Sequence, residues 1–76
     1  MHEASYPGFY RAIVVDNHDP KNQGRLRLMV PQVSGENTTD WAWPILTVAI
    51  PPAAGTALWA AFEGGDPNFP LWIGTL

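Results

Sequence analysis

The sequence predicts an all-β fold of five short strands with little or no helix. Two turn segments, residues 19–25 and 62–70, lie between apolar runs and combine the Gly, Pro, Asp and Asn that tight turns require. Residues 24–30 alternate with the period of a strand, and no segment sustains a helical period. This pattern indicates a small closed or sandwich-like β fold. Closure is favoured because the chain has few of the charges that protect open sheet edges.

The N-terminal part is predicted to form an arm followed by the first strand. Residues 1–8 are polar and end at a Pro-Gly pair, which predicts an extended arm. Residues 9–16 are dense in β-branched and aromatic side chains, which predicts a strand. Because Ile13, Val14 and Val15 are consecutive, we expect both faces of this strand to be covered. Residues 9–76 then form a single barrel domain.

Residues 24–30 carry the clearest strand pattern in the chain. The aliphatic side chains predicted to face the interior are Leu26, Leu28 and Val30. The side chains predicted to face outward are Arg25, Arg27 and Met29. Pro31 ends this strand because proline has no backbone N–H to donate to a sheet.

The middle of the chain is predicted to hold one short strand between two irregular segments. Residues 32–40 are polar and rich in loop-forming residues. Residues 41–46 follow as the third strand, which Pro44 restricts to a sheet edge or a bulge. Residues 47–55 are rich in Pro and Ala without a helical period, so they are predicted to connect strands without forming a helix.

Two further strands are predicted in the C-terminal part of the chain. Residues 56–63 alternate so that Trp59 faces outward. The inward side chains of this strand are predicted to be Leu58, Ala60 and Phe62. In residues 70–76, Leu71 and Ile73 are predicted to face inward, which turns Trp72 outward.

Composition excludes several classes of protein and leaves assembly as a source of stability. A chain of 76 residues has a marginal core, and without cysteine it gains nothing from disulfides or thiolate metal sites. The net charge of −3 argues against a phosphate-binding surface. No apolar segment approaches the ~20 residues of a membrane helix, and the first residues lack a signal-peptide pattern. We therefore expect a cytoplasmic protein, or one assembled into a particle there.

The residues that could carry catalysis are better explained by turn structure. Asp16, His18 and Asp19 lie around the first turn, where Asp caps its own backbone and a histidine is usually solvated. Arg25 and Arg27 could bind an anion, but in a net-acidic chain a salt bridge or hydration is expected instead. We predict no catalytic residue, no metal site and no cofactor.

The order and spacing of the motifs resemble a known family over nearly the whole chain. The first half contains Tyr10-Arg11, Val14-Val15-Asp16-Asn17, Asp19-Pro20 and Gly24-Arg25-Leu26, ending at Val30-Pro31. The second half contains Trp41, Pro44, Pro52, Gly55 and Leu58, then Phe62-Glu63-Gly64-Gly65-Asp66-Pro67, Pro70, Trp72 and Gly74. This pattern resembles the OB-fold domain of phage tail hub proteins. That group includes baseplate assembly protein V, the tail-lysozyme hub proteins and the valine-glycine repeat spike proteins of type VI secretion.

The resemblance implies a five-stranded OB-fold barrel with a structural role in the baseplate of a virion tail, assembled in the host cytoplasm. It implies a homotrimer on the tail axis, between a hub ring protein and a central spike, without a catalytic centre. Hub proteins usually continue into the spike, whereas this chain stops at Leu76. We therefore expect a stand-alone domain with a separate spike protein, and no stable membrane association.

The expected contact residues are the outward tryptophans and their neighbours. Trp is enriched at interface hot spots, where a partner removes its large surface from water. The predicted interface residues are Trp59, Trp72, Met29, Arg25, Arg27, Trp41 and Trp43. Trp41 and Trp43 share a face of the third predicted strand, and the sequence is consistent with either a core position or a contact position for both. Pro51-Pro52 folding over the rings within one chain is an alternative to an interface. The alternative function is single-stranded nucleic-acid binding, which OB folds perform with aromatic platforms and a basic groove.

Overall fold

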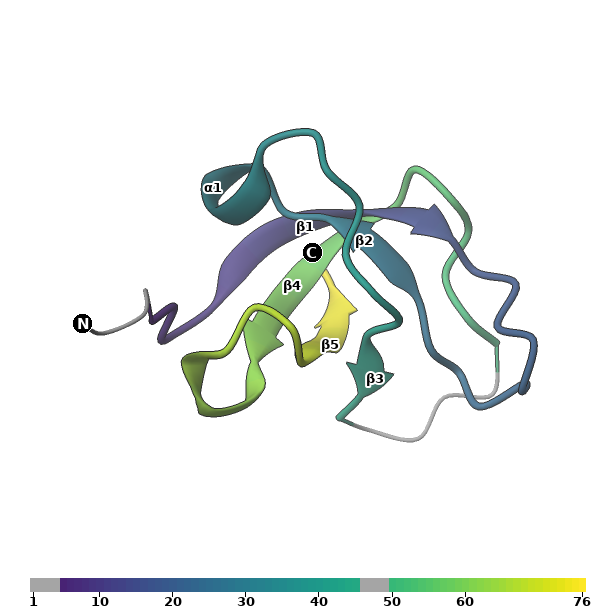
Figure 1. Cartoon of the computed structure of the whole chain (residues 1–76). Helices are drawn as coiled ribbons and strands as arrows, with labels where there is room; N and C mark the ends of the chain where they lie inside the picture. Colours follow the sequence, from purple (N-terminus) through teal and green to yellow (C-terminus); the bar gives the residue numbers. More distant parts are fainter. Residues whose placement is uncertain (1–4, 46–49) are drawn as a thin grey trace.

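The computed structural model describes residues 5–45 and 50–76 of the chain (Figure 1). The strands are β1 (Tyr10–Asp16), β2 (Arg27–Met29), β3 (Trp43–Pro44), β4 (Ala57–Phe62) and β5 (Pro70–Thr75). The helical segments are one turn each, α1 (Pro31–Ser34) and the 3-10 helix η1 (Glu63–Gly65). The prediction of an all-β fold with little helix is confirmed.

The strands form one sheet that curls into a half-barrel with the order β2-β1-β4-β5-β3. All neighbouring strands are antiparallel except β3, which runs parallel to β5. Two isolated bridges, Leu26 with Ala42 and Met29 with Thr38, join the edge at β2 to the segment that leads into β3. The two edges of the sheet are therefore linked through this segment, as expected for a chain with few edge-protecting charges.

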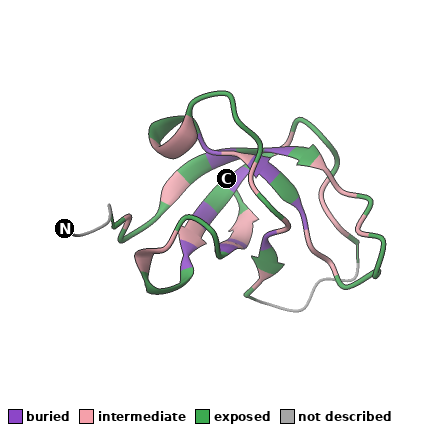
Figure 2. Cartoon of the chain, in the orientation of Figure 1, coloured by how far each residue is buried: buried purple, intermediate pink, exposed green. Residues whose placement is uncertain are grey.

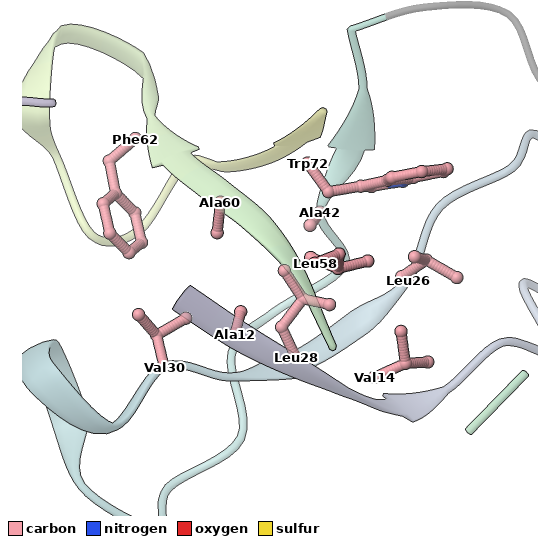
Figure 3. Close-up of a cluster of buried hydrophobic side chains, with 10 residues drawn as sticks. All are labelled: Ala12, Val14, Leu26, Leu28, Val30, Ala42, Leu58, Ala60, Phe62 and Trp72. Atoms are coloured by element: carbon pink, nitrogen blue, oxygen red, sulfur yellow. The ribbon is translucent and has the colours of Figure 1, made fainter. Parts of the chain in front are cut away.

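Most of the predicted strand parity is confirmed in the core. Leu26, Leu28, Val30 and Leu58 are fully buried, and Ala60 and Phe62 lie beside them (Figure 3). The alternation of buried and exposed residues along β1 and β4 is visible in Figure 2. Alternation in β2 specifies the register because Arg27 and Met29 flank the inward Leu28, whereas β4 has apolar residues on both faces and buries the face of Leu58 and Phe62.

The predicted outward orientation of Trp72 is wrong. Its indole is 3% exposed, and its Nε1–H donates a hydrogen bond of 3.0 Å to the carbonyl oxygen of Gly24. In β5, Trp72 pairs with Ala60 and Pro70 pairs with Phe62. Directly paired residues share a face, so the inward Ala60 and Phe62 turn these two residues inward. The small alanines of the core cluster leave the volume that an indole needs.

The prediction that both faces of the first strand are covered is also wrong for the single chain. Ala12 and Val14 are buried, whereas Ile13 and Val15 are 37% and 45% exposed. The consecutive apolar residues of β1 therefore give one face to the core and one to the outside.

The segments between strands follow the predictions with one addition. The predicted loop at 32–40 begins inside α1, where Pro31 occupies the first turn, a position that needs no N–H donor. β3 lies at the end of the sheet order, so the edge position predicted from Pro44 is confirmed. Residues 50–55 contain no helix, and residues 46–49 of the predicted strand and connector lie outside the described residues.

The described part of the predicted arm packs against one end of the barrel. The N–H of Tyr6 donates a 2.9 Å hydrogen bond to the carbonyl of Gly65. Its ring lies 6.5 Å from that of Tyr10 and 6.2 Å from that of Phe62, between centroids. The Tyr10 hydroxyl donates to the carbonyl of Pro7 at 2.8 Å. Residues 1–4 of the arm lie outside the described residues.

Replacing Tyr6 with alanine should therefore weaken the fold. Two tilted or edge-on aromatic pairs contribute about 0.5–1.5 kcal/mol each, so we expect a loss of roughly 1–3 kcal/mol in unfolding free energy. Urea unfolding of the variant measures this loss. Phe69→Ala is the control, because Phe69 is 58% exposed, lies outside both candidate surfaces described below, and its removal should change stability by less than about 0.5 kcal/mol. Equal losses in the two variants would contradict the packing role of Tyr6.

Candidate interaction surfaces

One candidate surface lies on the outer face of the sheet. Ile13 pairs directly with Met29 of β2 and with Ala57 of β4, so the three side chains share this face. Two residues along β1, and therefore on the same face, Arg11 is opposite Trp59. We call this surface the outer apolar face and define it by Phe9, Ile13, Met29, Trp59 and Ile73, with Arg11 among them.

Trp59 is the centre of the outer apolar face. Its side chain is 36% exposed, and with Phe9 and Ile73 it lines an open hollow whose walls are almost wholly apolar. The Arg11 guanidinium carbon lies 5.7 Å from the Trp59 ring centroid, in the position of a cation–π contact. The flanking side chains on β4 are Ala57 and Ala61, which do not cover the indole.

A second candidate surface is organised by the turn between β1 and β2. The Asp19 carboxylate accepts hydrogen bonds from the backbone N–H groups of Lys21, Gln23 and Arg25, at 2.9, 2.9 and 3.2 Å. It also accepts from Arg25 Nε at 3.0 Å and Nη2 at 2.7 Å, a bidentate pair. The predicted capping role of Asp19 is confirmed, and the predicted salt bridge of Arg25 is made within the chain.

The electrostatics of this pair follow from its geometry. The Asp19 and Arg25 side chains are only 3% and 13% exposed. The side-chain hydrogen bond from Arg25 is the main reason that the pKa of Asp19 lies well below its usual range. Burial opposes this shift, and the backbone N–H donors of the turn add to it. The same pairing raises the pKa of Arg25, so both groups are charged near neutral pH.

Arg25 also joins the turn to the two tryptophans before and at the start of β3. Its guanidinium carbon lies 5.6 Å from the ring centroid of Trp41 and 5.2 Å from that of Trp43. Arg27 lies 5.9 Å from the Trp41 centroid, and its Nε donates to the carbonyl of Thr39 at 3.3 Å. We call Arg25, Arg27, Trp41 and Trp43 the Arg–Trp cluster. Trp43 is its most exposed ring, at 47%.

The structure divides the predicted contact residues into two groups and removes one. Trp59 faces outward as predicted, and Met29 lies half-buried on the same outer apolar face. The other four form the Arg–Trp cluster, in which Trp41 and Trp43 share a face as predicted. Trp72 belongs to the core and is unavailable to a partner.

Sequence reasoning missed four residues of the outer apolar face, and one of them, Ile73, was predicted to face inward. Phe9, Arg11 and Ile13 occupy alternate positions before and within β1, and Ile13 was expected to be covered. The period of two in residues 9–13 indicates that these side chains share a face, but the apolar run that follows conceals this pattern. Only the pairing of β1 with β4 decides which of the two faces of β1 is buried.

The remaining ionisable groups do not converge on a reactive site. His18 is almost fully exposed, with Nδ1 3.6 Å from an Asp16 carboxylate oxygen, as expected for a solvated turn histidine. Within residues 5–45 and 50–76, no three His, Cys, Asp or Glu side chains are grouped to hold a metal ion. In the same part of the chain, no helix has the length and apolar character needed to span a bilayer.

Comparison with known families supports the resemblance deduced from the motifs. The family described as the type VI secretion system/phage-baseplate injector OB domain matches residues 10–76. The match begins at the first residue of β1 and includes β5, so it covers the whole sheet. No curated protein matches the chain.

Proposed function

Because the chain belongs to the family of type VI secretion system and phage-baseplate injector OB domains, we propose that it is a structural baseplate component which self-associates at the tail tip. In this proposal three copies lie on the tail axis, between a hub ring protein and a separate central spike. The family match over residues 10–76 is the observation that carries the proposal. The domain has a scaffolding role and no catalytic centre of its own. It reaches its place in the virion tail after assembly in the host cytoplasm.

Two surfaces of the barrel support a role in assembly. The outer apolar face exposes Trp59 and Phe9, and contiguous apolar surface of this kind marks protein contacts. The Arg–Trp cluster combines two residue types that are enriched at interface hot spots. Arg25 is already paired with Asp19, which leaves Arg27 as the cluster's cation for an acidic partner. A barrel with two such surfaces is suited to contact more than one neighbour.

Co-assembly tests this proposal directly. The purified chain would be mixed with the hub ring protein and the spike protein of the same particle, and the products weighed by native mass spectrometry. We expect a complex that contains both partners and three copies of this chain. A stable monomer that binds neither partner at micromolar concentration would contradict the proposal.

Reversing the charge of Arg27 should weaken contact with an acidic partner. Arg27→Glu removes the exposed guanidinium and introduces repulsion, so we expect affinity for the hub ring protein to fall about tenfold or more. Lys21→Glu is the matched control, because Lys21 is an exposed cation of the turn outside the Arg–Trp cluster. Calorimetric titration of both variants measures the difference. Equal affinities for the two variants would show that Arg27 makes no such contact.

One observation favours single-stranded nucleic-acid binding as a second candidate. OB folds bind oligonucleotides on the face of strands 2 and 3, and the Arg–Trp cluster lies on β2 and the segment leading into β3. Pairing of Arg25 with Asp19 and the net charge of −3 weaken this candidate. Oligonucleotide binding that declines steeply with salt would support it, whereas the structural proposal predicts no binding.

A further inference from the structure

The outer apolar face combines exposed apolar side chains with strands that hold few carboxylates. Phe9, Ile13 and Trp59 are 65%, 37% and 36% exposed; Ile13 and Trp59 lie on the adjacent strands β1 and β4, and Phe9 comes directly before β1. Among the described residues, β4 and β5 contain no acidic side chain, and β1 contains only Asp16 at its last position. A monomer in water gains nothing from this arrangement, because the exposed rings order water without packing.

The distribution of charge indicates which kind of neighbour fits this face. The described carboxylates outside β1 lie in the turns and loops at Asp19, Glu36, Asp40, Glu63 and Asp66. Two copies of a chain with a net charge of −3 repel one another wherever these turns meet. The outer apolar face avoids this repulsion. Its one cation, Arg11, lies over the ring of Trp59, whose electron-rich face stabilises the charge.

The shape of the outer apolar face also suits contact with a second copy of the chain. The hollow lined by Phe9, Trp59 and Ile73 is open and apolar, and the Phe9 ring beside it protrudes. A face that has both a projection and a recess of the same chemistry can pack head to tail, with the projection of one copy in the recess of the next around a three-fold axis. Each copy then fills part of its neighbour's hollow, which buries rings that are otherwise wet.

The area is sufficient for the centre of such a contact. Aromatic side chains offer about 150–250 Å² each, so the exposed parts of Phe9 and Trp59 together present on the order of 200 Å². The aliphatic and Met side chains extend the face toward the ~300–600 Å² of functional patches. A standard interface buries ~800 Å² on each partner, with an apolar centre and a polar rim. The outer apolar face supplies that centre, and the strand ends around it supply the rim.

We propose that copies of this chain pack against one another through the outer apolar face, with the hollow beside Trp59 filled by an apolar side chain of the neighbouring copy. This inference rests on the self-association in the proposed function and assigns it to a surface. It leaves the Arg–Trp cluster free for a partner of different sequence.

Sedimentation equilibrium of the full chain and two variants tests the assignment. Ile13→Glu places a carboxylate in the outer apolar face, and Ile45→Glu makes the same exchange at an exposed isoleucine next to β3. We expect the wild type to associate, Ile13→Glu to raise the dissociation constant roughly 30-fold or more, and Ile45→Glu to change it less than about threefold. Circular dichroism establishes that each variant is folded.

Ile13→Ala serves as a second variant if the glutamate prevents folding, because it removes contact area without adding charge. It should raise the dissociation constant about fivefold. The inference is overturned if Ile13 and Ile45 variants associate equally, or if the wild type is monomeric up to about 1 mM. Co-assembly with the hub and spike proteins is measured in a separate experiment, which distinguishes failure of this assignment from failure of the proposed function. If Ile13→Glu still enters that complex with three copies, the assignment of the face fails while the proposed function stands.

Discussion

Replacing Trp72 with alanine is expected to remove about 3–5 kcal/mol of unfolding free energy, because it empties the volume of an indole from the core. A domain of 76 residues is typically stable by about 4–11 kcal/mol, so the variant should lose a large share of its stability. The orphaned carbonyl of Gly24 adds to the cost, since it loses the Nε1–H donor. Chemical denaturation monitored by circular dichroism measures this loss in unfolding free energy.

Two other variants show that the effect comes from burial rather than from losing a tryptophan. Trp43→Ala removes a ring that is 47% exposed and should cost less than half as much. Trp72→Phe keeps an aromatic ring but removes the donor to Gly24, and we expect a loss of about 1–3 kcal/mol. If Trp72→Ala and Trp43→Ala are equally stable, the inward orientation of Trp72 is incorrect.

Replacing Asp19 with asparagine is expected to destabilise the chain strongly at neutral pH and to flatten its response to acid. The pKa of Asp19 is lower in the folded chain than its ordinary value of about 3.9. Such a group stabilises the fold fully above its unfolded pKa, and this contribution is lost as pH falls toward the folded pKa. The gap in unfolding free energy between wild type and Asp19→Asn should therefore narrow as pH falls below about 4.

Asp16→Asn is the matched control for this experiment. The Asp16 carboxylate accepts a turn hydrogen bond from the N–H of His18 but is 40% exposed and has no guanidinium partner. Both variants are measured from pH 7 to pH 2, and we expect Asp16→Asn to lose less unfolding free energy at pH 7 than Asp19→Asn, because Asp16 lacks the bidentate arginine of Asp19. A gap between wild type and Asp19→Asn that stays constant over this range would contradict the role given to the ionised carboxylate.

Much of the fold could be predicted from sequence, because the clearest strand alternates between apolar and charged side chains. Leu26 lies between Arg25 and Arg27, and Leu28 lies between Arg27 and Met29, so period and burial agree. In β4 both faces are apolar, and the expected inward side chains Leu58 and Phe62 are the buried ones. The capping role of Asp19 also followed from turn chemistry. The family resemblance carried the OB fold itself, which residue patterns alone left as a small barrel or sandwich.

The orientation of β5 could not be predicted, because both of its faces are apolar. Leu71, Trp72 and Ile73 satisfy a core in either register, and a shift of one residue exchanges the two faces. The irregularity in the pairing of β4 and β5 between Trp59 and Ala60 is a long-range feature that no local pattern contains. The same limit applied to β1, where Ile13 follows a core residue and precedes another.

The bidentate pair of Asp19 and Arg25 shows another limit of sequence reasoning. Both residues were recognised, but their contact depends on a turn that brings positions six apart within hydrogen-bond distance. The stacking of Trp41 and Trp43 on Arg25 then depends on the bridge between Leu26 and Ala42. Predicting contacts of this kind requires knowledge of the pairing register between segments that are distant in sequence.

The assembled state of the outer apolar face tests the account most directly. Hydroxyl-radical footprinting would compare the oxidation of each tryptophan in the isolated chain, diluted until it is monomeric, and in the complex with the hub and spike proteins. We predict that Trp59 becomes protected on assembly, whereas Trp72 is unreactive in both states because it is buried within the barrel. Oxidation of Trp59 at the same rate in the complex and in the isolated chain would contradict the account, because the exposed indole would then have no partner.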